Sequence, residues 1–194
     1  MSDFITFNDI TVRLGNQYVF KNYSEKIKKE TVTCIMGPSG SGKTTLLRLI
    51  MGLISPKSGT VDGIKGERIA AVFQEDRLCL HLSSVENVAL VLRDFFPRDI
   101  IKQNLLSLSL TEDDLLKTTS EFSGGMRRRV AVARAIMANR DIVLLDEPFK
   151  GLDDITRNAT YEYIKKNTAQ KTVITVTHDI QDAAMMNAEI IRIV

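Results

Sequence analysis

A glycine-rich segment of this 194-residue chain has the residue types and spacing of a phosphate-binding loop. It runs Gly37-Pro38-Ser39-Gly40-Ser41-Gly42-Lys43-Thr44, with Thr45 as a further phosphate-binding candidate, between an apolar run and a helix-like stretch. Glycines let successive backbone N–H groups turn toward one point, and a helix N-terminus adds positive potential for phosphate oxygens. In this pattern Lys43 serves the β- and γ-phosphates and the Thr44 hydroxyl serves Mg²⁺. The alternative, a glycine-rich turn followed by a chance Lys-Thr pair, fits the flanking strand and helix poorly.

Two adjacent carboxylates follow a second apolar run, Ile142–Leu145. Ligand sites of open parallel sheets lie at the carboxyl ends of the strands, which is where Asp146 and Glu147 are expected. Asp146 can hold Mg²⁺, directly or through water, and Glu147 can accept a proton from an attacking water. Alone, this pattern is as typical of a helix cap or an exposed turn, but the upstream phosphate loop favours a nucleotide site.

The elements that position these motifs alternate between strand and helix. Short strands are expected near residues 5–7, 10–12 and 18–20, with a turn at Gly15-Asn16 and a hairpin turn at Asp62-Gly63. Apolar strands are expected at 31–36, 69–73, 142–145, 172–176 and 190–194, and helices at 44–51, 124–138, 153–166 and 180–187. Alternation of continuous apolar strands with helices predicts an α/β fold with a mainly parallel sheet buried on both faces.

A helical stretch interrupts this alternation between residues 75 and 122. Thr111 with Asp114 resembles a helix start within it. Apolar residues also recur on one helical stripe, at Ile101, Leu105 and Leu108. We therefore predict a single domain over residues 1–194, with an antiparallel β portion at its N-terminal end and a helical subdomain inserted at 75–122.

Composition sets bounds on the class of protein. The chain is 44% hydrophobic and 26% charged with a net charge of +2, which argues for neither a nucleic-acid partner nor an anionic membrane surface. The one compact basic run, Arg127-Arg128-Arg129, is interpreted as a solvated helix face. Cys34 and Cys79 show no metal-ligand spacing and fit a reducing compartment. Without a signal peptide or a long apolar segment, we expect a cytosolic protein that reaches a membrane only through a partner.

A third motif lies between the two phosphate motifs, at Phe122-Ser123-Gly124-Gly125-Met126-Arg127. Ser123 would cap a helix whose first N–H groups the glycines leave unobstructed, which makes a second anion site; an ordinary capped helix is the alternative. The motif resembles the signature of the ATP-binding cassette (ABC) family, Leu-Ser-Gly-Gly-Gln or, in many importers, with Met in the last place. The resemblance implies that Ser123, Gly124 and Gly125 bind the γ-phosphate held by the phosphate loop of another subunit.

Further residues resemble family motifs in the expected order. Gln74 resembles the glutamine that touches Mg²⁺ and the attacking water, and His178 resembles the switch histidine that contacts the γ-phosphate. Asp153, in Gly151-Leu152-Asp153, resembles the segment that communicates across the dimer and is counted among the nucleotide-binding residues. The resemblance thus implies a P-loop NTPase with ATP and Mg²⁺ as cofactors. Its catalytic residues would be Glu147, His178, Gln74 and Lys43, and its metal ligands Thr44, Gln74 and Asp146.

Within the family, four segments look like the ATPases of nitrate, sulfonate and taurine-type importers: 72–78, 85–88, 124–127 and 146–149. Other positions depart from the family pattern. Leu14 stands where an aromatic residue often stacks on adenine, and Tyr18 is the nearest aromatic substitute. Leu80-His81 replaces a common Pro-Trp pair in a region that faces the membrane subunit, and Lys150-Gly151 replaces a small pair.

One phosphate loop and one signature motif do not complete a family site within a chain, whereas two copies packed head to tail do. The resemblance therefore implies an ATPase that powers import of a small anionic or nitrogen- or sulfur-containing solute. Its partners would be a second copy of itself, a membrane permease that holds the chain at the inner face of the cell membrane and, indirectly, a solute-binding protein. The alternatives are an exporter ATPase, which shares the motor; a DNA-associated ABC ATPase, disfavoured by the compact insert and weak charge; and a nucleotide-sensing adaptor, disfavoured by the complete set of catalytic residues.

Overall fold

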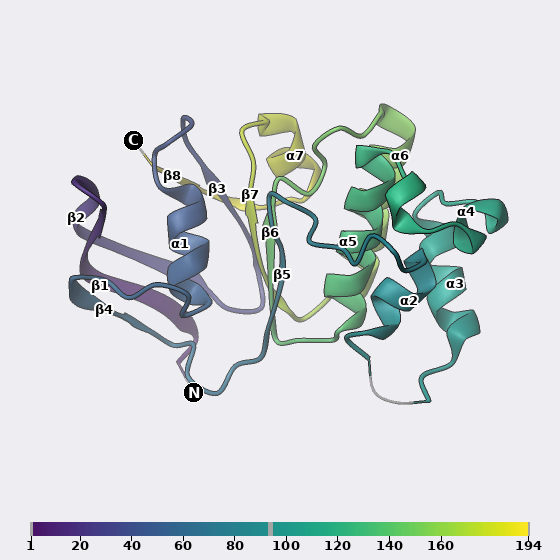
Figure 1. Cartoon of the computed structure of the whole chain (residues 1–194). Helices are drawn as coiled ribbons and strands as arrows, with labels where there is room; N and C mark the ends of the chain where they lie inside the picture. The colour runs from purple at the N-terminus through teal and green to yellow at the C-terminus, as the bar shows by residue number, and fades with distance from the viewer. Residues whose placement is uncertain (1, 93–94, 194) are drawn as a thin grey trace.

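The computed structural model of the chain describes residues 2–92 and 95–193, and its strands form two sheets of opposite character (Figure 1). The first is antiparallel, with the order β2-β1-β4, and consists of β1 Phe4–Leu14, β2 Gln17–Lys28 and β4 Ser58–Asp62. The second is parallel, with the order β5-β6-β7-β3-β8. Its strands are β3 Val32–Met36, β5 Ile69–Val72, β6 Ile142–Asp146, β7 Thr172–Val176 and β8 Glu189–Arg192. The predicted α/β fold with a mainly parallel sheet and an N-terminal antiparallel portion is confirmed; Val194, the last residue of the final predicted strand, lies outside the described residues.

The parallel sheet separates two hydrophobic clusters because successive side chains of a strand point to opposite faces. In β6, Ile142 and Leu144 join the cluster built around helix α1, Lys43–Ile50, while Val143 and Leu145 join the cluster around helix α5, Gly124–Met137. The α1 cluster also takes the inner face of β1. Every residue of β6 and β7 is buried, as expected for central strands covered on both faces.

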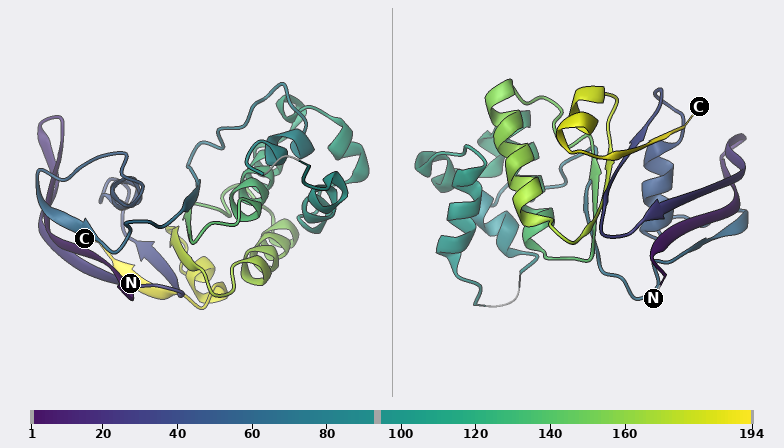
Figure 2. Two further views of the ribbon diagram at one scale, coloured as in Figure 1. Left: turned by 90° about the horizontal axis from the view of Figure 1, so that it is seen from below. Right: turned by 180° about the vertical axis from the view of Figure 1, so that it is seen from behind.

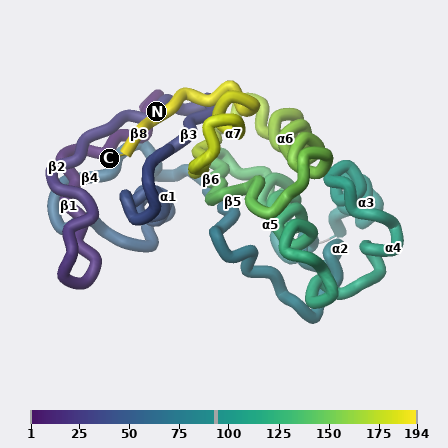
Figure 3. Tube along the Cα trace, turned by 90° about the horizontal axis from the view of Figure 1, so that it is seen from above, coloured from purple at the N-terminus to yellow at the C-terminus, as the bar shows by residue number. Residues whose placement is uncertain are grey.

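The remaining helices belong mainly to the α5 side. They are α2 Ser84–Ala89, α3 Arg98–Ser107, α4 Glu112–Leu116, α6 Asp154–Asn167 and α7 Ile180–Met185. The described chain curves into an arch, with the antiparallel sheet at one end and α2, α3 and α4 at the other (Figure 2). The same curvature is visible from above, where α1 and the parallel sheet lie between the two ends (Figure 3).

The segment between β5 and α5 contains α2, α3 and α4 and a short 3₁₀ helix, Thr119–Glu121, as the prediction of a helical stretch requires. Residues 73–83 are not helical, and residues 93–94 lie outside the described part of the chain. The stripe Ile101, Leu105 and Leu108 is completely buried. Thr111 and Asp114 form a reciprocal capping box at the start of α4, with the Thr111 hydroxyl accepting from the Asp114 N–H at 3.2 Å. Among the described residues, no helix combines the length and the apolar character needed to cross a membrane.

The hairpin predicted at Asp62-Gly63 is wrong. Strand β4 pairs with β1, and the chain then crosses to β5 in the other sheet, so among the described residues no strand follows Asp62-Gly63 back alongside β4. Gly63 has a φ of +86°, and a Cβ there would collide with the carbonyl of Phe4. Glycine is therefore required here by its left-handed conformation and by its close approach to the backbone of β1. An Asp-Gly pair suits such a crossing as well as it suits a hairpin turn.

Candidate nucleotide-binding site

The glycine-rich loop joins the end of β3 to the start of α1. Gly40 and Gly42 have φ angles of +84° and +100°, a region that favours glycine. At Gly42 an added Cβ would also lie 2.6 Å from side-chain atoms of Val19 and Phe20. Gly42 is the N-cap of α1 and brings no side chain to the cap, so the first N–H groups of the helix stay available to an anion.

Lys43 and Thr44 place a cation and a hydroxyl at this helix start. The Lys43 ammonium donates to the carbonyls of Gly37 and Pro38 at 2.8 and 2.7 Å, which holds it over the loop. The Thr44 hydroxyl donates to Asp146 Oδ2 at 3.0 Å and so joins α1 to the end of β6. Burial raises the pKa of Asp146, and the Thr44 hydrogen bond opposes this shift.

Glu147 and His178 meet where β6 and β7 end. His178 Nδ1 lies 2.9 Å from Glu147 Oε1, and the Glu147 N–H donates to the carbonyl of Val176 at 2.9 Å. Glu147 has a φ of +54°, an unfavourable conformation of the kind that concentrates at functional sites. The hydrogen bond and the negative charge of Glu147 raise the pKa of His178 above its ordinary value.

These groups open onto a cleft of about 600 Å³, a size typical of small-molecule sites. Its predicted site residues are Gly37, Pro38, Ser39, Gly40, Gly42, Lys43, Thr44, Thr45, Gln74, Asp146, Glu147 and His178. The oxygen donors of Thr44, Asp146 and Gln74 suit Mg²⁺, which prefers hard oxygen ligands and is typically held by one or two carboxylates together with substrate phosphates. The donor chemistry of the cleft therefore fits the predicted metal.

The other end of the cleft has apolar and amide side chains in place of an aromatic ring. Its lining there includes Leu14, Gln17 and Val19, and Lys150 lies in the wall as well. The structure does not bring Tyr18 to this end, so the suggested aromatic substitute is wrong. Three cations instead lie over the Tyr18 ring. The charged groups of Arg13, Lys21 and Lys57 are 5.6, 4.9 and 5.9 Å from the ring centroid.

Five predicted site residues do not line this cleft: Ser41, Ser123, Gly124, Gly125 and Asp153. Ser123 caps α5 by accepting the Met126 N–H at 3.2 Å, and Asp153 caps α6 by accepting the Thr156 N–H at 2.9 Å. The two caps are neighbours, because a Cβ at Gly125 would lie 2.9 Å from the carbonyl of Gly151. Ser123, Gly124 and Asp153 are exposed and form a second cluster of polar backbone and side-chain groups.

The interpretation of the basic run on α5 as a solvated helix face is wrong for two of its three arginines, whereas Arg127 is half-buried. Arg128 and Arg129 are only 5% and 7% exposed, and they donate to backbone carbonyls of other segments. A stronger signal lay in the residues that follow. Residues 130–133 and 135–136 are apolar and cover nearly the whole circumference of the helix, which is typical of a buried helix. Arginines on a buried helix must find hydrogen-bond partners inside the protein.

Arg157 is a further residue that sequence reasoning missed. Its guanidinium lies 2.7 Å from Asp179 Oδ2 and 3.0 Å from Asp182 Oδ1, and Asp182 also accepts from the Thr177 hydroxyl at 2.8 Å. The residues on both sides of His178 are thus tied to α6 and α7. Nothing local in the sequence indicates these contacts, since Asp179 follows Arg157 by 22 positions.

The glycine-rich loop leads from the end of β3 directly into α1, and Thr44 at the start of α1 contacts the end of β6. This strand–loop–helix arrangement defines the class of P-loop nucleoside triphosphatases. Within that class the chain belongs to the ABC transporter family, whose profile matches residues 20–150. It is an ATP-binding and ATP-hydrolysing subunit of the ABC transporter type.

Relatives of known role differ in what they transport. The chain is 38% identical to the aliphatic sulfonates import ATP-binding protein SsuB of Bacillus cereus, over 91% of this chain and 74% of that protein. It is 34% identical to the intermembrane phospholipid transport ATP-binding protein MlaF of Haemophilus influenzae, over 92% and 75% of the two chains. Among solved structures, the cassette MJ0796 in a dimeric post-hydrolysis state with ADP and Pi superimposes with a TM-score of 0.85, at 32% identity and over 97% and 94% of the chains.

Proposed function

We propose that this chain is the ATPase of an importer for a small anionic or nitrogen- or sulfur-containing solute, acting through a separate membrane permease. The observation that carries the proposal is its 36–38% identity, over about nine-tenths of the chain, to several aliphatic sulfonate import ATP-binding proteins. The chain would work in the cytoplasm at the inner face of the membrane, with a solute-binding protein as an indirect partner and no nucleic acid. The working unit would be a single domain over residues 1–194, with 75–122 as its helical subdomain.

In the proposed site, the loop N–H groups and Lys43 bind the phosphates of ATP. Mg²⁺, held by Thr44, Asp146 and Gln74, would offset the negative charge of the phosphates when bound. Glu147 lies at the end of β6, and its Oε1 contacts His178. The other carboxylate oxygen, which has no hydrogen-bond partner among the described residues, would accept a proton from water. Water then attacks the γ-phosphorus, the proton passes to Glu147, and ADP leaves with the bridging oxygen; His178 contacts the transferred phosphate.

The site would be completed by a second copy of the chain packed head to tail. The first turn of α5 carries exposed Ser123 and Gly124 at a helix N-terminus, a position that favours anions. Neither residue lines the cleft of its own chain. In the proposed dimer, Ser123, Gly124, Gly125 and Asp153 approach the nucleotide bound by the phosphate loop of the partner subunit.

Reconstitution tests the direction and the class of solute. The membrane subunit that copurifies with the chain is inserted into vesicles together with it, and ATP-dependent movement of a radiolabelled aliphatic sulfonate is measured with ATP on the side of this chain. The proposal expects movement toward the ATP side, with no movement for the Lys43→Ala variant. Movement away from ATP, or movement of phospholipid instead of sulfonate, would contradict it.

A further inference from the structure

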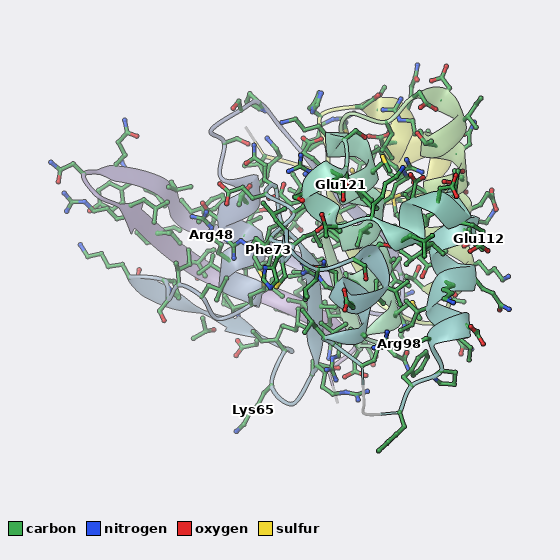
Figure 4. The ribbon with its side chains drawn as sticks, turned by 45° about the vertical axis from the view of Figure 1, so that its right-hand side comes forward. Arg48, Lys65, Phe73, Arg98, Glu112 and Glu121 are labelled. Atoms are coloured by element: carbon green, nitrogen blue, oxygen red, sulfur yellow. The ribbon has the colours of Figure 1, made fainter. Side chains whose placement is uncertain are left out.

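One buried side chain of α5 reaches out of the helical side of the molecule to the segment that carries Gln74. The Arg128 guanidinium donates from Nη1 to the carbonyl of Phe73 and from Nη2 to the carbonyl of Gln74, each at 2.6 Å. Its Nε lies 3.1 Å from Asp76 Oδ1, and Nη1 is also 3.5 Å from the carbonyl of Asp146. Figure 4 shows Phe73 in the stretch that leads from the parallel sheet to the helices. Three of these four acceptors thus lie in one segment, residues 73–76, which follows β5.

The neighbouring arginine makes a different set of contacts. Arg129 is as deeply buried as Arg128, and its Nη1 donates to the carbonyls of Leu108 and Ser109 at 2.6 Å each. Its Nε donates to the carbonyl of Gly125 within α5 itself, at 3.3 Å. Arg129 therefore ties α5 to its own side of the molecule, whereas Arg128 ties α5 to a segment whose Gln74 lines the nucleotide cleft.

The contacts of Arg128 are costly to lose because its guanidinium is buried and the carbonyls that it reaches are partly buried. A guanidinium presents a rigid fork of donors, which here is matched to two adjacent carbonyls, while the Asp76 carboxylate lies close enough for an ion pair. Without it, the carbonyls of Phe73 and Gln74 would lose hydrogen bonds from a charged donor in a partly buried site. Burial already raises the pKa of Asp76, and Arg128 is the largest of the nearby charges that oppose the shift, with Arg127 and Arg134 contributing. The segment is thus held in place chiefly from α5.

We propose that Arg128 is a positioning residue that fixes the Gln74 segment to helix α5, so that Gln74 and the first turn of α5 move as one unit. The inference rests on the proposed function, in which Gln74 serves the nucleotide of its own chain and Ser123 serves that of the second copy. Arg128 then links the two nucleotide sites of the dimer. Arg134 supports the same segment farther along, by donating to the carbonyls of Asp76 and Arg77 at 2.9 and 2.8 Å.

The test compares Arg128→Met with Arg129→Met, because both remove one buried guanidinium from the same helix. Turnover of ATP is measured separately from the dissociation constant of ATP, together with amide hydrogen exchange over residues 73–77. For Arg128→Met we expect kcat to fall about tenfold to a hundredfold, as for other misplaced active-site groups, with ATP affinity kept within about twofold. Exchange over residues 73–77 should accelerate in this variant and not in Arg129→Met. Arg128→Lys, which keeps the charge and loses the fork, should recover part of kcat.

The inference is overturned if Arg128→Met keeps kcat within about twofold of the native protein, or if Arg129→Met lowers kcat and raises exchange at 73–77 equally. Should Arg128→Met not fold, Asp76→Asn takes its place, since it weakens the same clamp without emptying the site. It should lower kcat in the same direction by a smaller factor, and native kcat with native exchange would reject the clamp. A native chain without ATP turnover would contradict the proposed function instead, so the two failures are distinguishable.

Discussion

The first turns of α1 and α5 begin alike and are surrounded differently. Each follows a small residue, Gly42 or Ser123, and each presents free backbone N–H groups at a helix start. Around α1, the same chain supplies a lysine, two carboxylates and a histidine in a cleft of about 600 Å³. Around α5 it supplies the cap itself and the neighbouring Asp153, both exposed.

The difference is the one expected if each chain carries two half-sites, as we propose. In the proposed function, the start of α1 carries the groups that bind and cleave a phosphate, whereas the start of α5 carries the groups that complete such a site on a second copy. Two half-sites on one chain make two complete sites when two copies form a two-fold dimer, because each copy then completes the site of the other. The predictions that follow separate the roles of the two helix starts, and the largest effects come from the chemistry at α1.

Glu147→Gln should nearly abolish ATP turnover while leaving ATP binding in place. The amide preserves the shape of the side chain at the end of β6 but does not accept the proton of the attacking water. A fall in kcat of about a thousandfold is expected, within the usual range for a lost general base. The measurement is steady-state phosphate release alongside ATP binding. Turnover at the native rate would remove Glu147 from the role of base.

Changes at Ser123 should lower turnover without touching the cleft. Aspartate is as good an N-cap as serine, and its charge stabilises a helix start, but it repels an incoming phosphate. Ser123→Asp should therefore keep the native Tm and lose about a hundredfold in kcat, in the range of a lost electrostatic contact. Ser123→Ala is the matched control: it should cost about 1 kcal/mol of stability through the lost cap and reduce kcat less. Native kcat in Ser123→Asp would mean that the start of α5 never meets a phosphate.

Leu14→Tyr should tighten nucleotide binding by a modest factor. An aromatic ring at the base end of the cleft would stack on adenine, and such stacking contributes about 1 kcal/mol or more per base, roughly fivefold in Kd. Calorimetry with ATP should show the gain, whereas inorganic tripolyphosphate, which has no base, should bind equally to both proteins. Leu14→Met serves as the control without a ring. An equal gain for tripolyphosphate would place the effect in the phosphate loop.

The pKa of His178 should depend on Glu147. The native pKa lies above the ordinary value because Glu147 Oε1 stabilises the imidazolium, so Glu147→Gln should lower it. The stabilisation of the fold by this pair is present below the unfolded pKa and is lost as the pH rises through the raised folded pKa. Histidine NMR titration, with His81 as the second reporter, measures the shift. An unchanged pKa for His178 in the variant would contradict the contact.

Residues that act through neighbours in the sequence were predictable, and residues that act through distant contacts were not. The loop at 37–44 and the capping box of Thr111 carry their chemistry within a few positions, so their patterns predict their structures. The hairpin prediction at Asp62-Gly63 was wrong because strand pairing depends on which strand edge is available, and β4 pairs with the edge of β1. The prediction of a solvated Arg128 was wrong because its partner, the carbonyl of Phe73, is 55 positions away in the sequence, and no local pattern indicates such a contact.

The exchange of half-sites between two copies is tested most directly by mixing two inactive variants, Lys43→Ala and Ser123→Asp. A mixed dimer pairs one damaged phosphate loop with one damaged α5 start and leaves the other site intact. With equal amounts, half of the dimers are mixed and each holds one of two sites, so turnover should return to about a quarter of the native value. If each chain instead completes its own site, the mixture would stay as inactive as either variant alone.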